Sequence, residues 1–211
     1  MPALNRRTAT VAAVTAALFA VCTAITAAGM LDGLDHSAAA TVRRTAVRAG
    51  DVVLSFLTLP ASVQISAAWL GMLAAIATRR PWWRGRVAAL AIVLVAGVAI
   101  EVAMKTLIDH PGPHPARGLL VLGSGELGRG SFPSGHACRG TTMAFGTALL
   151  AGGARRRPAL VMAAGYAALL AWTMVYLNWH WTSDVIGGVL LGITAAAIVA
   201  AVPAVAPQTS P

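Results

Sequence analysis

Six long apolar stretches, each close to the roughly 20 residues that a helix needs to cross a bilayer, constrain the fold of this chain more than any other feature. They run approximately over 11–31, 52–78, 87–104, 136–152, 159–177 and 184–202. Only 11% of the residues are charged, against about 25% in a typical soluble domain. We therefore predict an all-α polytopic membrane protein, a six-transmembrane-helix bundle, with one domain over 1–203 and a disordered tail over 204–211.

Two of these stretches carry features that indicate how they are used. The first follows Arg6 and Arg7, as the apolar part of a secretory signal does. It exceeds the roughly 7–15 apolar residues of a signal peptide, so we expect a retained helix. The second contains Pro60 and Gln64, which predict a kink packed against neighbouring helices rather than facing lipid.

The formal net charge of +9 first suggests nucleic acid as a partner. Its distribution argues otherwise, because nine arginines lie in the three segments that a six-span chain exposes on one side. These are Arg6, Arg7, Arg79, Arg80, Arg84, Arg86, Arg155, Arg156 and Arg157. The other seven basic residues and all seven acidic residues fall on the opposite side, where their charges cancel. We therefore expect membrane lipids and no nucleic acid as partners, while nothing in the sequence indicates an oligomeric state.

By the positive-inside rule, the arginine-rich segments face the cytoplasm. We predict a multi-pass protein of the cell membrane with both termini cytoplasmic and with the loops 32–51, 105–135 and 178–183 facing outward. The first of these loops is either a basic interfacial helix near anionic headgroups or a short solvated connector. The chain has 15 arginines and a single lysine, which suggests a bacterial source with GC-rich coding.

The outward side also holds the polar residues that suggest chemistry. Pro133, Ser134 and Gly135 directly precede the fourth apolar stretch, so the backbone amides at its start have no helical partners. A helix start of this kind binds anions such as phosphate. His136 stands in the first turn, within reach of a bound group. The alternative is a plain helix cap followed by a solvent-facing histidine.

A second pair stands at the start of the last apolar stretch. His180 and Asp184 are spaced i, i+4, which places them on one helical face. A carboxylate beside an imidazole fixes its tautomer and prepares a nucleophilic or basic histidine; a purely structural pair is the alternative. The chain has no HExxH motif, and Cys22 and Cys138 have no metal-ligand spacing, so we expect no metal and no other cofactor.

A third element is the single lysine, Lys105, at the outer end of the third stretch. A lysine at a membrane edge is normally an anchor that extends toward the headgroups. Its position beside the polar loop favours a specific role instead. Glu101 lies four residues earlier on the same face, where it can pair with Lys105.

Taken in order, these residues resemble the three motifs of the type 2 phosphatidic acid phosphatase superfamily, the membrane lipid phosphatases related to vanadium haloperoxidases. Lys105 begins the first motif, K-x6-RP, and residues 133–136 supply the second, PSGH, in full. Thr173, His180 and Asp184 fall on the third, SR-x5-H-x3-D.

The resemblance implies a phosphoryl transfer in two steps without a metal. His180 would attack phosphorus to form a phosphohistidine, and Asp184 would orient its imidazole. His136 would protonate the leaving oxygen and then activate the hydrolytic water. The equatorial phosphate oxygens, whose negative charge needs stabilisation, would be held by Lys105, Ser134 and Gly135.

The chain departs from the family at two positions. The arginine of the first motif is replaced by Gly112 and that of the third by Met174. Losing two charge-assisted contacts of about 1.5–3 kcal/mol each would be costly. We hypothesise that Arg139, one turn after His136, supplies a replacement phosphate contact, and the alternative is an arginine that extends to the headgroups. A second replacement could come from the 105–135 loop, which contains Arg117 and Arg129.

Two functions therefore compete. The first is an integral membrane lipid phosphatase acting at the outer face on a polyprenyl diphosphate, phosphatidic acid, phosphatidylglycerol phosphate or a polyprenyl-phosphate sugar. The second is a catalytically degenerate protein on the same fold that binds or transports lipid phosphates. The two lost arginines motivate the second, whereas the retained nucleophile and acid favour the first. For His110 and His114, which lie among prolines, we weigh lining of a rigid loop against a substrate role.

Overall fold

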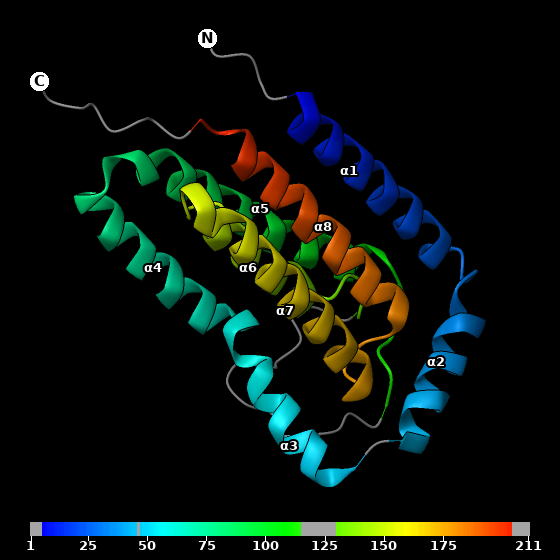
Figure 1. Cartoon of the computed structure of the whole chain (residues 1–211). Helices are drawn as coiled ribbons and strands as arrows, with labels where there is room; N and C mark the ends of the chain where they lie inside the picture. The colour runs from blue at the N-terminus through cyan, green and yellow to red at the C-terminus, as the bar shows by residue number, and fades with distance from the viewer. Residues whose placement is uncertain (1–5, 46, 115–129, 204–211) are drawn as a thin grey trace, which may run out of the picture.

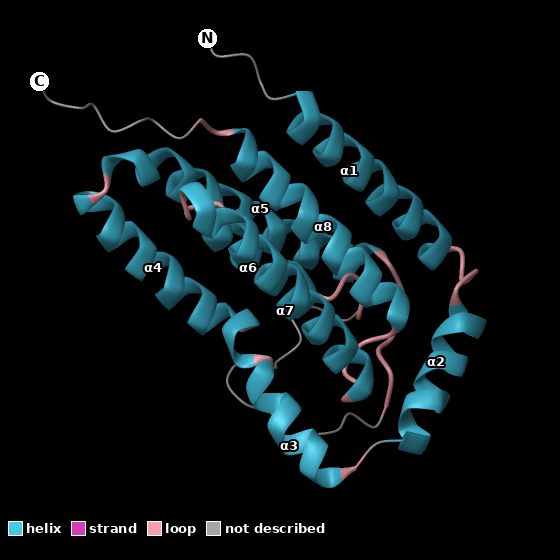
Figure 2. Ribbon diagram, in the orientation of Figure 1, coloured by secondary structure: helices cyan, strands magenta, loops and turns pink. Residues whose placement is uncertain are grey.

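The computed structural model describes residues 6–45, 47–114 and 130–203, and its regular elements are all helical (Figures 1 and 2). The helices are α1 (Arg6–Ala27), α2 (Asp32–Thr45), α3 (Arg48–Leu57), α4 (Val63–Arg79), α5 (Arg84–Leu107), α6 (Gly135–Ala148), α7 (Arg156–Tyr176) and α8 (Thr182–Ala201). Short 3-10 turns, Leu59–Ala61, Pro81–Trp83 and Gly153–Arg155, precede α4, α5 and α7. The all-α prediction is confirmed for this part of the chain.

Four segments of the described chain are long and apolar enough to cross a membrane: Arg6–Ala27, Pro81–Leu107, Gly153–Tyr176 and Thr182–Ala201. A fifth is possible if the bent pair Ala49–Ala61 and Val63–Arg79 counts as one span. The fourth predicted stretch forms α6, which has only 14 residues, fewer than the roughly 20 that a typical span needs. A multi-pass membrane protein is therefore supported, while the number six stays a prediction.

The bend before α4 has the cause that the sequence indicated. Pro60 lies in the 3-10 turn between α3 and α4, and the two helical segments differ in direction by 47°. Proline breaks the helical hydrogen-bond ladder at this point. The Ala61 carbonyl, at the end of this turn, accepts a hydrogen bond from Arg139 of α6. The kink packs against neighbouring helices as predicted, since Ala61 and Ser62 are buried, although the Gln64 side chain itself is exposed.

Close packing of α8 against α6 fixes the centre of the bundle. A Cβ at Gly188 would collide with the Ser134 carbonyl oxygen, and one at Gly192 would lie 2.8 Å from the Cys138 carbonyl oxygen. Glycine at both positions therefore lets the two backbones approach closely, as small residues do between membrane helices. The first turns of both helices are brought together by this contact.

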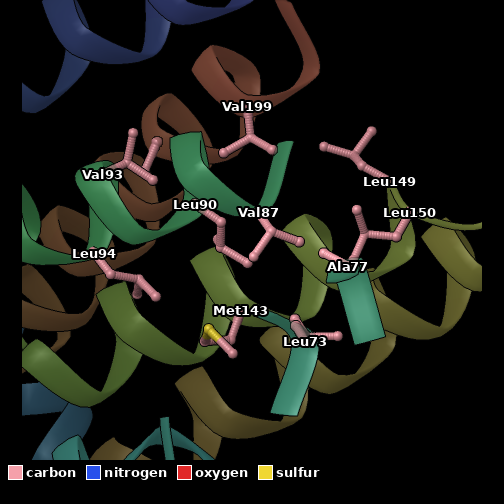
Figure 3. Close-up of a cluster of buried hydrophobic side chains, with 11 residues drawn as sticks. Leu73, Ala77, Val87, Leu90, Val93, Leu94, Met143, Leu149, Leu150 and Val199 are labelled. Carbon is pink, nitrogen blue, oxygen red and sulfur yellow. The ribbon is translucent and has the colours of Figure 1, made fainter. Parts of the chain in front are cut away.

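A cluster of buried apolar side chains holds the end of the bundle where α5 and α7 begin and α4, α6 and α8 finish (Figure 3). Leu73 of α4, Val87 and Leu90 of α5, Met143 of α6 and Val199 of α8 all contribute to it. Burying such side chains contributes about 1.5–3 kcal/mol each. This end of the molecule is an apolar core, and the polar residues gather at the other end of α6 and α8.

The described arginine-rich segments lie at the same end as this cluster. The start of α1 and the end of α8 lie there in Figure 1, as does the turn between α4 and α5. Arg86 of α5 donates hydrogen bonds to the carbonyls of Val202 and Leu149, which follow α8 and α6. The arginine-rich segments that the charge pattern placed on one side of the membrane thus lie at one end of the helix bundle. The predicted tail over 204–211 lies outside the described residues.

The loop over 32–51 is helical rather than a plain connector. Residues 32–45 form α2, and α3 begins at Arg48. Asp32 and Asp35 stand in the first turn of α2, where acidic side chains stabilise the helix. Asp35 is buried against the start of α8, so α2 is packed onto the bundle. The solvated-connector alternative is therefore wrong.

Candidate active site

The motif over 133–136 lies at the start of α6 and is tied to the start of α8. Ser134 is the N-cap of α6, and its Oγ accepts a hydrogen bond from the Ala137 amide at 3.3 Å. The Ser134 amide donates to the backbone carbonyl of Asp184 at 2.9 Å. The two predicted halves of the site are therefore joined directly through the backbone.

His180 and Asp184 form the pair that their spacing predicted. His180 Nδ1 lies 3.3 Å from Asp184 Oδ2. The same carboxylate oxygen accepts a hydrogen bond from the Trp181 amide at 2.9 Å, which caps α8. Both side chains are buried. Because Nδ1 faces the carboxylate, Nε2 is the ring nitrogen that is left for other contacts.

Ser131 adds a third member that the sequence analysis missed. Its hydroxyl donates to Asp184 Oδ2 at 2.5 Å and lies 3.0 Å from His180 Nδ1. Ser131 is fully buried and its amide donates to the His110 carbonyl at 2.8 Å. The available signal was its place two residues before Pro133. A serine in a polar loop does not by itself indicate contact with His180 and Asp184, which lie 49 and 53 positions away.

His110 is the second residue whose role the sequence left open. Its Nε2 lies 3.4 Å from Asp184 Oδ1, the carboxylate oxygen that faces away from His180. The same nitrogen lies 3.4 Å from Ser183 Oγ and 4.0 Å from Asp35 Oδ2. His114, the other candidate in this proline-rich stretch, is exposed. The structure thus distinguishes two histidines that the sequence treats alike.

Asp35 connects this group to α2. Its carboxylate accepts two hydrogen bonds from Ser183, one from the amide at 2.9 Å and one from the hydroxyl at 2.6 Å. Asp35 and Ser183 are both almost fully buried. Ser183, the neighbour of Asp184, is therefore held in place by α2, which lies about 150 positions earlier in the chain.

His136 faces the pair from the start of α6. Its ring packs edge-on against Trp179, with the ring centroids 5.8 Å apart. His180, Lys105 and Arg139 all lie within electrostatic range of its imidazole. His136 is buried, so the alternative of a solvent-facing histidine is wrong. The structure thus brings the predicted nucleophile, acid and two cations to one place.

The two cations share one carboxylate. Lys105 Nζ lies 3.1 Å from Glu101 Oε1, as the i, i+4 spacing predicted, and Arg139 Nη1 lies 2.5 Å from Glu101 Oε2. Arg139 Nε also donates to the Ala61 carbonyl at 3.0 Å. Arg139 is only 5% exposed, so the alternative of an arginine that extends to the membrane surface is wrong. Whether it contacts phosphate stays a prediction.

Glycine at position 135 has a steric reason. A Cβ on Gly135 would collide with the carboxylate of Glu101, whose oxygens lie against the first turn of α6. Glu101 thereby touches Gly135 as well as Lys105 and Arg139. The sequence predicted only the pairing of Glu101 with Lys105, because the other two contacts join different helices.

Gly112 and Met174 stand at the two positions where the motif resemblance would place arginines. Met174 is fully buried in an apolar cluster with Ala61, Leu170 and Val185. Gly112 lines a cavity of about 260 Å³ beside α2. The other candidate replacements, Arg117 and Arg129, lie outside the described residues.

Two further observations bear on what the site could hold. Within residues 6–45, 47–114 and 130–203, no three histidine, cysteine, aspartate or glutamate side chains are arranged to hold a metal ion. A larger groove of about 610 Å³ runs between α4, α6 and α7, and its lining is mainly apolar, including Pro60, Trp69, Met143 and Tyr166. It reaches Gly140, the neighbour of Arg139.

Comparison with known proteins places this arrangement in context. Residues 86–206 match the sequence model of the PAP2 superfamily. The fold is similar to the crystal structure of a transmembrane PAP2-type phosphatidylglycerolphosphate phosphatase from Bacillus subtilis, with a TM-score of 0.75 and 18% sequence identity over 89% of this chain and 93% of that one. No curated protein sequence matches this chain.

Proposed function

This chain belongs to the PAP2 superfamily, and from that premise we propose that it is an integral membrane lipid phosphatase that works through a phosphohistidine on His180. The observation that carries the proposal is the pairing of His180 Nδ1 with Asp184 and Ser131, which leaves Nε2 for attack on a substrate, within electrostatic range of the buried His136. A protein that only bound lipid phosphates would not need this arrangement.

In the first step, His180 Nε2 attacks phosphorus and the bond from phosphorus to the lipid oxygen breaks. This step needs a protonated His136, a form that the negative charge of the bound phosphate would favour, and His136 gives its proton to the departing oxygen. The products are a phosphohistidine and a lipid alcohol, or a lipid monophosphate when the substrate is a diphosphate. Asp184 and Ser131 hold the imidazole in one tautomer and stabilise the positive charge that develops on it.

In the second step, water attacks the phosphohistidine. His136, now neutral, accepts a proton from the water, and the phosphorus–nitrogen bond breaks. Inorganic phosphate leaves and His180 is restored. Each step needs His136 in a different protonation state, and the first step leaves it in the state that the second requires.

The phosphate group would be held by Lys105, Arg139 and the start of α6. Ser134 accepts a capping hydrogen bond through Oγ but retains its own hydroxyl proton for a phosphate oxygen. The Gly135 amide stands in the first turn, where helical amides have no intrahelical partner. In this proposal Arg139 supplies one of the cations that are missing at Gly112 and Met174, and the site works without a metal.

The lipid part of the substrate would lie in the groove between α4, α6 and α7. Its mainly apolar lining and its volume of about 610 Å³ suit a hydrocarbon chain, and it ends next to Arg139. Polyprenyl diphosphates, phosphatidic acid, phosphatidylglycerol phosphate and polyprenyl-phosphate sugars all combine such a chain with a phosphate. The similarity to a phosphatidylglycerolphosphate phosphatase supports the third of these.

We further propose that residues 1–203 form one six-span domain in a bacterial cell membrane. The common end that carries the arginines would face the cytoplasm together with both termini. The start of α6 and the start of α8 would then lie at the outer face. Substrates would be lipids whose headgroups reach the outer leaflet.

The experiment is a phosphate-release assay with the purified protein in mixed micelles, using a panel of these four lipid classes. We expect release from at least one of them and complete loss in His180→Ala. His114→Ala is the matched control, because His114 is an exposed histidine of the neighbouring loop, and it should keep full activity. Release by His180→Ala at the unaltered rate would refute the proposed nucleophile.

The alternative is a catalytically degenerate binding or transport protein on the same fold. The buried, apolar Met174 at a position where the family has an arginine favours it. If no lipid of the panel releases phosphate while the protein still binds lipid phosphates, this alternative replaces the phosphatase.

A further inference from the structure

A carboxylate already lies where the substrate phosphate is expected to bind. Glu101 contacts Lys105 through Oε1 and Arg139 through Oε2, and its carboxylate touches Gly135 at the start of α6. These are three of the four residues that would hold the phosphate. An anion held by two cations at a helix start is the arrangement that a bound phosphate would show.

The surroundings make this contact strong. Glu101, Lys105 and Arg139 are 3%, 4% and 5% exposed, so water screens their interactions little. Arg139 is further restrained by its bond to the Ala61 carbonyl, so its guanidinium cannot swing toward a ligand elsewhere. A phosphate must therefore come to this position to use both cations.

We propose that Glu101 is an internal competitor for phosphate. In the resting protein its carboxylate occupies the anion position, and a phosphate group gains Lys105 and Arg139 only by displacing it. This inference rests on the proposed function, since it assigns Glu101 a role at the same site. Two cations and one carboxylate leave a single net positive charge for the ligand, so Glu101 lowers the affinity for phosphate and limits how tightly the product is held.

The test compares the wild-type protein with Glu101→Gln, purified as the full chain in detergent. Glutamine keeps the shape and one acceptor oxygen but removes the negative charge. Titration calorimetry with inorganic phosphate should give a dissociation constant about tenfold lower in the variant. A residue that merely holds the two cations in place would have the opposite effect, because its loss would weaken binding.

Asp109→Asn is the matched control. Asp109 is an exposed acid close to the end of α5, and no contact joins it to Lys105 or Arg139 in the described part of the chain. Its neutralisation removes the same charge from the same end of the molecule. We expect phosphate affinity within about twofold of the wild type.

A second arm measures KM for a short-chain lipid phosphate. If Glu101 competes with the lipid headgroup as well as with free phosphate, KM should fall in Glu101→Gln by a factor similar to that for phosphate. A fall for inorganic phosphate alone would overturn the claim for the lipid headgroup.

Three results decide the remaining points. Unchanged or weaker phosphate binding by Glu101→Gln overturns the inference about Glu101. The proposed function is judged separately, and it stands if the phosphatase activity depends on His180. No phosphate binding by either protein overturns the anion site and the inference with it. If Glu101→Gln does not fold, Glu101→Asp, whose carboxylate is one methylene shorter, should also bind phosphate more tightly than wild type, and equal or weaker binding overturns the inference.

Discussion

His110 Nε2 lies 3.4 Å from Asp184 Oδ1. His180 faces the other oxygen of the same carboxylate, Oδ2, so one aspartate lies between two imidazoles. Asp184 Oδ1 is buried and has no hydrogen bond of normal geometry within the described residues. The His110 contact is therefore what fixes this side of the carboxylate.

We expect His110→Ala to lower kcat by about tenfold or more with little change in KM. The substitution leaves Asp184 Oδ1 without its neighbour, which loosens the carboxylate that orients His180, while the phosphate contacts remain. Steady-state kinetics on the best lipid of the panel measures the effect. His110→Gln, which retains a donor, should recover part of kcat. An equal rise in KM with unchanged kcat would place His110 in substrate binding instead.

Ser131→Ala should lower kcat by about tenfold, because it removes a hydroxyl that contacts both His180 and Asp184. A hydrogen bond to a charged group contributes about 1.5–3 kcal/mol, of which only the part specific to the transition state affects kcat. Ser37→Ala serves as the control, since Ser37 is an exposed residue of α2 whose hydroxyl bonds its own helix. Full activity of Ser131→Ala would mean that Asp184 alone orients the nucleophile.

Arg139→Ala should lower kcat/KM by about 10- to 100-fold, which corresponds to the loss of one charge-assisted contact to phosphate. Arg157→Ala, at an exposed arginine of α7, should have no effect. Both rates can be measured in the same micelles. Unaltered phosphatase activity of Arg139→Ala would reject Arg139 as a replacement for the missing motif arginines.

Gly188→Ala should destabilise the protein and reduce its activity together. The added Cβ collides with the Ser134 carbonyl oxygen, and overpacking of this kind costs about 1–3 kcal/mol. Thermal unfolding followed by circular dichroism should show Tm lowered by several degrees. Gly165→Ala on α7 is the control, because a Cβ there meets no atom within 4 Å. Its Tm should stay the same or rise.

The parts of the site that the sequence predicted are those with short-range spacing. His180 and Asp184 are four residues apart, as are Glu101 and Lys105, so helical periodicity alone brings each pair together. Ser134 and Gly135 precede an apolar stretch, so their place at a helix start also followed from the sequence. The all-helical fold followed from the apolar stretches, although their number as spans did not.

The parts that the sequence could not predict depend on contacts between distant segments. Ser131, His110 and Asp35 reach Asp184 or its neighbour Ser183 only because α2, the loop before α6 and the start of α8 pack together. The same holds for Arg139, whose burial depends on Glu101 of α5 and Ala61 before α4. A polar side chain next to a kink can point either way, so the sequence predicted the packed kink but not that Gln64 itself is exposed.

The bond from the Ser134 amide to the Asp184 carbonyl has a mechanical consequence. It joins the α6 start that carries His136 to the α8 start that follows His180, so the positions of the proposed acid and the proposed nucleophile are coupled. A mutation that shifts either helix start is therefore expected to shift the other as well. The groove between α4, α6 and α7 shares no such bond with the Asp184 carbonyl, so substitutions in its lining would change the shape of the groove without moving the two histidines.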